Sequence, residues 1–230
     1  MQQLWNQSKR FVESRFFVLL ISILLILIVG PYLKENAVTN WLVGLTSVCV
    51  IGGVIYSVKE KTRYLRLFII LALITLLLSF MDIFTENPSL HIASMSVFIL
   101  FLLVSVIDLN YEIFNEVKIT RDILYGSICG YFLIIILFGS LYLLLESVAP
   151  GSFHHSVNWE SAEFTHHQMY YYSTITITTL GYGDIVPVSV LAKSIAMIEC
   201  ITGVFYIAIL VARLIGLQQH AQDTRSNQDK

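Results

Sequence analysis

The chain has 230 residues, of which 56% are hydrophobic and only 13% are charged, and its formal net charge is -2. Soluble domains usually carry about a quarter charged residues, so this composition excludes an ordinary water-facing globular protein. A near-neutral charge without a basic block gives no reason to expect a nucleic-acid partner. This composition predicts an integral membrane protein that is embedded in a lipid bilayer.

Six apolar stretches follow one another along the chain. A bilayer core of about 30 Å requires about 20 apolar residues in a helix. The stretches that meet this requirement are 16–33, 37–58, 64–83, 90–109, 123–147 and 190–217. The first could be mistaken for a signal peptide, but no small-residue cleavage pattern comes after it, so a retained span is expected. The sequence therefore predicts an all-α membrane protein with six transmembrane helices.

Lysine and arginine are distributed unequally between the two sides of these spans. If the N-terminus is cytoplasmic, twelve of the fourteen lie on the cytoplasmic side, and only Lys34 and Lys193 lie on the other. Cytoplasmic loops of membrane proteins carry such an excess. Both termini are therefore expected in the cytoplasm, and the segment 148–189 is expected to face outward. A compact chain without a soluble regulatory domain suits a plasma membrane or a bacterial inner membrane.

The connection at 110–121 has a helical pattern. Ile113, Phe114 and Val117 recur at three- and four-residue spacing, with Glu112 and Glu116 elsewhere on the wheel. Such a pattern predicts a short amphipathic helix along the inner membrane surface. An ordinary polar loop is the alternative.

The outward segment contains a part, about Thr165 to Thr178, that is too short to cross a bilayer. It is predicted to form a short helix that dips in from outside, followed by an extended return through Gly181 and Gly183. Irregular backbone at membrane depth is tolerated only where it is buried in protein or lines a watery path. The arrangement therefore predicts a re-entrant pore helix.

Residues 178–184 read TTLGYGD, which resembles the potassium-channel signature usually written TTVGYGD. The resemblance implies a filter in which backbone carbonyls, with the Thr179 hydroxyl, replace the hydration water of K⁺. The residues implied to coordinate K⁺, with no other cofactor, are Thr179, Leu180, Gly181 and Tyr182. Leu180 departs from the commoner valine, but its carbonyl would still meet the ion, so selectivity is expected to survive.

The resemblance also implies supporting roles around the filter. Gly183 would allow the outer turn, and Thr178 and Asp184 would hold the two ends of the filter. Ile175 occupies a site where some family members carry a glutamate that pairs with the aspartate, so the Tyr172 hydroxyl is the predicted partner of Asp184. Tyr182 is expected to point away from the ion and to contact pore-helix tyrosines.

The last span carries two further candidates. Gly203 lies where related channels commonly carry a hinge glycine, although a small residue for close helix packing is an equal alternative. Glu199 lies midway along the span and is expected to hydrogen-bond to pore-helix hydroxyls such as Ser173 or Thr174, or else to tune ion occupancy or gating. Helical spacing predicts an inward apolar row that is a candidate gate: Val204, Ile207, Val211 and Ile215.

Four histidines in the outward segment are candidates for a proton- or zinc-sensitive entrance, because histidine titrates near neutral pH and binds zinc. They are His154, His155, His166 and His167. Their side chains occur in adjacent pairs, which do not share one helical face. Solvated loop residues are the simpler interpretation.

The function that these features predict is a potassium-selective, homotetrameric ion channel with passive conduction and no enzymatic activity. The fourth span has no arginine or lysine, so steep voltage gating is not expected. A non-conducting regulatory subunit and a weakly selective cation channel are the alternatives. The predicted parts are a cytoplasmic N-terminus (1–15), a voltage-sensor-like domain without sensing arginines (16–109), an interfacial linker helix (110–121), a pore domain (122–217) and a cytoplasmic tail (218–230).

Overall fold

The structure is a computed structural model that describes residues 15–29, 65–85, 87–116, 120–156 and 164–228. Side chains are described as far as residue 219. The predicted span 37–58 lies outside the described residues, as do residues 1–14 of the predicted cytoplasmic N-terminus and part of the outward segment.

The described chain is mostly helical. Its helices are α2 (Arg15–Val29), α4 (Leu65–Phe84), α5 (Pro88–Asn115), α6 (Arg121–Val148), α7 (His166–Ile177) and α8 (Val190–Gln228), and its strands are β1 (Phe153–His155) and β2 (Ile185–Pro187). Three of these helices contain stretches long and apolar enough to cross a membrane, namely Pro88–Asn115, Arg121–Val148 and Val190–Gln219. The architecture fits an all-α membrane protein.

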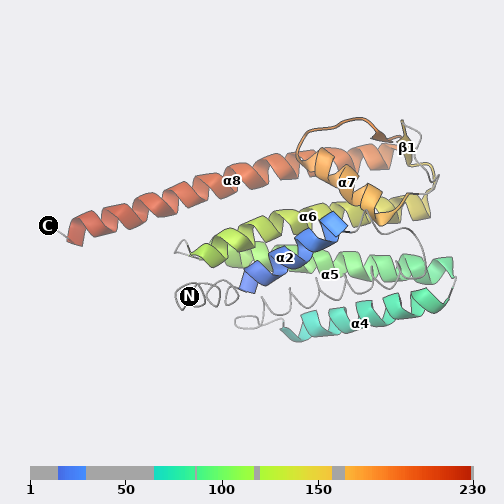
Figure 1. The fold of residues 1–230 in the computed structure, drawn as a ribbon, viewed down its shortest axis with the longest axis horizontal. Coiled ribbons are helices and arrows are strands. Elements are labelled where there is room, and N and C mark those ends of the chain that lie inside the picture. Colours follow the sequence, from blue (N-terminus) through green and yellow to red (C-terminus); the bar gives the residue numbers. More distant parts are fainter. Residues whose placement is uncertain (1–14, 30–64, 86, 117–119, 157–163, 229–230) are drawn as a thin grey trace, which may run out of the picture.

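Helix α6 lies at the centre of the bundle, and its buried residues extend over most of its length. Helices α2, α5, α7 and α8 all pack against it, while α4 packs on the outer side of α5. The short helix α7 lies between α6 and the first half of α8 (Figure 1). The central helix thus joins the α2–α4–α5 layer to the α7–α8 layer.

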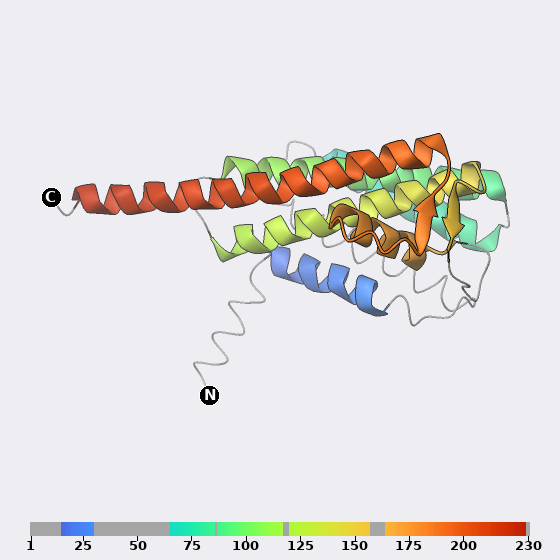
Figure 2. The same cartoon turned by 90° about the horizontal axis from the view of Figure 1, so that it is seen from above.

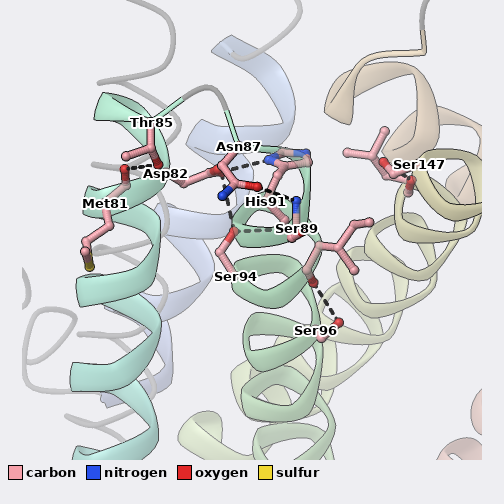
Figure 3. A network of polar contacts seen from close by, with 11 residues as sticks. Met81, Asp82, Thr85, Asn87, Ser89, His91, Ser94, Ser96 and Ser147 are labelled. Carbon is pink, nitrogen blue, oxygen red and sulfur yellow. Dashed lines mark hydrogen bonds and ion pairs between the residues drawn. The ribbon is translucent and has the colours of Figure 1, made fainter.

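Helices α4 and α5 are joined at their shared end by a polar network (Figure 3). Asn87 caps α5 by accepting a 3.0 Å hydrogen bond from the Ser89 amide, and Pro88 occupies the first helical position, where no amide hydrogen is needed. His91 Nδ1 lies 2.7 Å from Asp82 Oδ2, and the Ser94 hydroxyl lies 3.4 Å from the same carboxylate oxygen and 2.9 Å from the His91 carbonyl. These contacts hold the adjoining ends of α4 and α5 together.

The prediction of a separate linker helix at 110–121 is wrong for residues 110–115. Residues 110–115 continue α5, which ends at the cap residue Glu116. No helix breaker interrupts this stretch, and Ile113 is buried in the same core as the preceding turns. Arg213 of α8 also donates a 2.6 Å hydrogen bond to the Glu116 carbonyl and lies over the Phe114 ring. The linker is therefore short and tied to α8.

The helix itself does not end with the predicted span at residue 217. Helix α8 continues to Gln228 and extends well past the other helices (Figures 1 and 2). The residues after Leu217 are polar but include Gln, Ala and Arg, which are compatible with helix. A polar sequence here therefore ends the apolar span without ending the helix.

Candidate functional site

Helix α7 confirms the short helix predicted at about 165–178. Thr165 and Gln168 form a capping box, in which the Gln168 amide donates to Thr165 Oγ1 (3.3 Å) and the Thr165 amide donates to Gln168 Oε1 (2.9 Å). Thr178 is the C-cap, and its amide donates a hydrogen bond to the Thr174 carbonyl. Both ends of α7 are thus set by local sequence.

Glycine in α6 lets α7 approach closely. A Cβ atom on Gly139 would collide with the Tyr170 ring of α7, so the two helices meet at this point without a side chain between them. One turn earlier on α6, the Ile135 carbonyl accepts a 2.9 Å hydrogen bond from Ser173. Helix α7 is therefore seated on α6 by packing and by a buried hydrogen bond.

The backbone after α7 turns back and is held by the last turn of that helix. Thr179 donates its amide hydrogen to the Thr176 carbonyl (2.9 Å), and the amides of Leu180 and Gly181 both donate to the Ile175 carbonyl (2.8 and 3.0 Å). Among the described residues, no donor reaches the carbonyl oxygens of residues 179–183. The segment is thus anchored through its amides, and its carbonyls remain available.

Three alternate residues of this segment have positive φ angles: Thr179 (+58°), Gly181 (+52°) and Gly183 (+80°). Glycine adopts this region without steric cost, which explains the two glycines of the motif. Thr179 is the only residue other than glycine with positive φ in the described chain. Such strain persists only where the surrounding structure enforces it, and it commonly marks functional segments.

The filter-like segment, residues 178–184, is exposed on a single chain. Leu180 is 55% and Tyr182 is 68% exposed, and Thr178, Thr179, Gly181 and Gly183 are exposed as well. The expected packing of Tyr182 against pore-helix tyrosines does not bury this side chain in the described part of the chain. The reason is geometric, since the described part of one chain covers only one side of the segment.

The partner of Asp184 differs from the prediction. The hydroxyl of Tyr171, not Tyr172, donates a 2.6 Å hydrogen bond to Asp184 Oδ2. Tyr172 faces the interior, where its ring meets those of Tyr142 and Phe153 edge-on at 5.0 and 5.4 Å between centroids. Successive residues of a helix point about 100° apart, so only one of the two tyrosines can face Asp184.

Strands β1 and β2 hold the chain just after the segment. They pair antiparallel, with Phe153 opposite Pro187 and His155 opposite Ile185. The Ser156 amide donates a 2.8 Å hydrogen bond to the Asp184 carbonyl. Together with the Tyr171 bond, these contacts fix the end of the filter-like segment at Asp184.

If residues 178–184 conduct ions, as proposed below, Tyr171→Phe should speed the decay of that flux by roughly tenfold, while flux at the start stays close to wild type. A hydrogen bond to a charged group is worth about 1.5–3 kcal/mol, and tenfold corresponds to about 1.4 kcal/mol. The measurement is the time course of potassium efflux from loaded liposomes. Tyr172→Phe removes the same hydroxyl one residue away and is the matched control. An equal acceleration in both variants would contradict the assignment.

The inner-helix candidates fall on two different faces of α8. Glu199 and Gly203 are buried, whereas Val204, Ile207, Val211 and Ile215 are exposed. A Cβ on Gly203 would collide with the carbonyl oxygen and side chain of Ile177, which confirms the close-packing alternative for this glycine. Helix α8 is continuous through Gly203. A hinge and a gate at these positions stay predictions.

Glu199 bonds to one of the two predicted hydroxyls. Ser173 contacts its Oε1, while Thr174 instead donates to the Tyr170 carbonyl. Tyr142 of α6, which the sequence did not single out, donates to Oε2. An aromatic residue in an apolar span gives no pattern by which this partner could have been found.

The histidines of the outward segment do not gather into a metal site among the described residues. His155 stacks on Phe164 at 4.0 Å between ring centroids. Burial, with the nearby His91 and His167, lowers the pKa of His166 to about 4. This histidine is therefore neutral near pH 7, which argues against its titrating there as a proton sensor.

In a comparison with protein families, residues 130–218 match a family described as an ion channel. The matched region runs from α6 through α7 and the segment 178–184 into α8, which are the elements that build the candidate site. No solved structure matches the chain. The match and the long apolar helices support a membrane-embedded ion channel subunit.

Proposed function

We propose that four copies of this chain surround a common axis and form a potassium-selective channel. Conduction is passive and involves no covalent chemistry. The backbone oxygens of Thr179, Leu180, Gly181 and Tyr182, with the Thr179 hydroxyl, replace the hydration water of K⁺ as it enters. Each of these oxygens, repeated in the four subunits, forms one ring of ligands around the axis.

The observation that carries this proposal is the backbone of residues 179–183. Positive φ angles recur at every second residue, and the amides of 179–181 bond back to α7. An ion that loses its water needs oxygen ligands of similar strength, and unpaired carbonyls supply them. A segment with its amides tied down and its carbonyls unpaired is suited to this task.

Exposed apolar surface supports the assembly of several copies. One strand cannot surround an ion, and the filter-like segment of a single chain is open on one side. On α8, the residues that turn away from α6 and α7 are apolar and exposed, including Ile198, Ile201 and Phe205. Neighbouring copies and lipid would cover this surface.

The channel is proposed to lack steep voltage gating. A voltage sensor moves several arginines across the field, each worth about 2.3 kcal/mol per 100 mV. Helix α5, which overlaps the predicted fourth span, contains neither arginine nor lysine. Its charged residues are acidic and few, so the membrane potential has little charge to act upon.

Potassium and sodium flux through the purified protein in liposomes tests the function directly, with barium as blocker. Potassium-selective, barium-sensitive flux is the expected result. Equal sodium and potassium flux would instead indicate a weakly selective cation channel. Absence of flux across a range of voltage and pH would favour a non-conducting regulatory subunit.

A further inference from the structure

Three helices meet at the carboxyl group of Glu199. This side chain has no exposed surface. Tyr142 of α6 lies at its Oε2 atom, and Ser173 of α7 lies at its Oε1 atom, while Glu199 itself belongs to α8. The carboxyl is thus the polar contact that these three helices share behind the filter-like segment.

A count of hydrogens assigns the protonation state of this carboxyl. Ser173 Oγ also lies 2.9 Å from the Ile135 carbonyl, which can only accept. Serine has one hydroxyl hydrogen, so Ser173 can donate to only one of these two oxygens. The Tyr142 hydrogen lies on the other carboxyl oxygen. For both serine contacts to be full hydrogen bonds, the hydrogen between Glu199 and Ser173 must therefore come from Glu199.

The surroundings favour the same state. Both hydrogen bonds of Glu199 among the described residues are with hydroxyl groups, and no lysine, arginine or histidine of those residues pairs with it. An ionised carboxylate buried without a cation is costly, whereas a neutral carboxyl needs only hydrogen-bond partners. The neutral form has a partner for each oxygen here.

We infer that Glu199 is neutral and acts as a positioning residue, donating a hydrogen bond to Ser173 that fixes the pore helix α7 between α6 and α8. The next residue of α8, Cys200, has its Sγ 3.3 Å from the Thr176 carbonyl, and one turn along from Glu199 the backbone of Gly203 lies directly against Ile177. Glu199 therefore belongs to a continuous contact between α8 and the last turn of α7. The consequence for ion selectivity rests on the proposed function.

Glutamine and leucine at this position separate the neutral carboxyl from a charged one. Glutamine has one carbonyl oxygen, which can accept from Tyr142, and an amide group that can donate to Ser173, so it reproduces the hydrogen-bond pattern of a neutral carboxyl. Leucine has similar size and makes neither bond. Glu199→Gln is expected to keep the potassium-to-sodium flux ratio of the wild type, and Glu199→Leu to lose it.

Infrared spectroscopy tests the protonation state without any need for conduction. The wild-type protein is expected to show the carbonyl stretch of a protonated carboxylic acid, which disappears in the Glu199→Gln variant. Ser173→Ala removes the acceptor and is expected to shift this band. Tyr142→Phe should shift it as well, because the second oxygen loses its donor.

Two results would overturn the inference. One is the absence of a carboxylic acid band in the wild-type minus Glu199→Gln spectrum, which would mean an ionised group. The other is a glutamine variant whose flux ratio falls as far as that of the leucine variant. Should the leucine variant fail to fold, the infrared comparison still decides. A wild type that shows the band but conducts nothing would count against the proposed function alone.

Discussion

Gly183→Ala is expected to reduce potassium flux to the background of empty liposomes. Gly183 has a φ angle of +80°, and L-residues other than glycine adopt this left-handed region at a cost of about 1–2 kcal/mol. In the proposed assembly the strain recurs in every copy, and the backbone can relieve it only by turning carbonyls away from the ion path. Flux of potassium into liposomes, with and without barium, measures the loss.

Gly151 provides the matched control for this variant. It lies in the turn between α6 and β1 with a φ angle of +84°, and an added Cβ meets no atom within 4 Å at either glycine. Gly151→Ala should therefore carry the same backbone strain and a similar loss of thermal stability, but retain selective flux. Full flux in Gly183→Ala, or an equal loss in both variants, would contradict a conducting role for residues 179–183.

Gly203→Ala is expected to lower both thermal stability and the potassium-to-sodium flux ratio. The added Cβ would overlap the Ile177 carbonyl, so α7 or α8 must shift. Overpacking of this kind costs about 1–3 kcal/mol. Ile177 lies just before Thr178, and the shift therefore reaches the filter-like segment. Thermal unfolding in detergent and flux in liposomes measure the two effects.

Gly216→Ala is the control on the same helix. Gly216 is exposed, and an added Cβ there has no atom within 4 Å. Alanine is favoured over glycine inside a helix by about 1 kcal/mol, so this variant should be at least as stable as the wild type. If Gly203→Ala behaves like Gly216→Ala, the close contact with Ile177 does not determine the position of α7.

Much of the fold can be predicted from local sequence. The short stretch before Gly181 and Gly183 is predicted as a helix at about Thr165 to Thr178, which lies within a residue of the observed bounds of α7 at each end. The lengths of the apolar stretches predict the central parts of α5, α6 and α8. Helix ends are less predictable, because hydropathy reports the apolar stretch and not the helix. For this reason the extension of α5 to Asn115 and of α8 to Gln228 differs from the prediction.

Residue types in the candidate site can be predicted, but not every pairing. In the motif at 178–184, the two glycines predict where the backbone takes positive φ angles, at Gly181 and Gly183. The choice between Tyr171 and Tyr172 as partner of Asp184 depends on the rotation of α7 about its axis, which packing on α6 decides. Tyr142 could not be paired with Glu199 for a similar reason, since the contact joins residues 57 apart in the chain.

The contact between Gly203 and Ile177 has a thermodynamic consequence. It joins the middle of α8 directly to the residue that precedes the filter-like segment. If α8 has two positions, and they favour different conformations of that segment, the two equilibria share one coupling free energy. Linkage is reciprocal, so an ion that binds one filter conformation more tightly shifts α8 by the same factor by which α8 alters ion affinity. In the proposed channel, ion occupancy of residues 179–182 would then be measurable as a change in the position of α8.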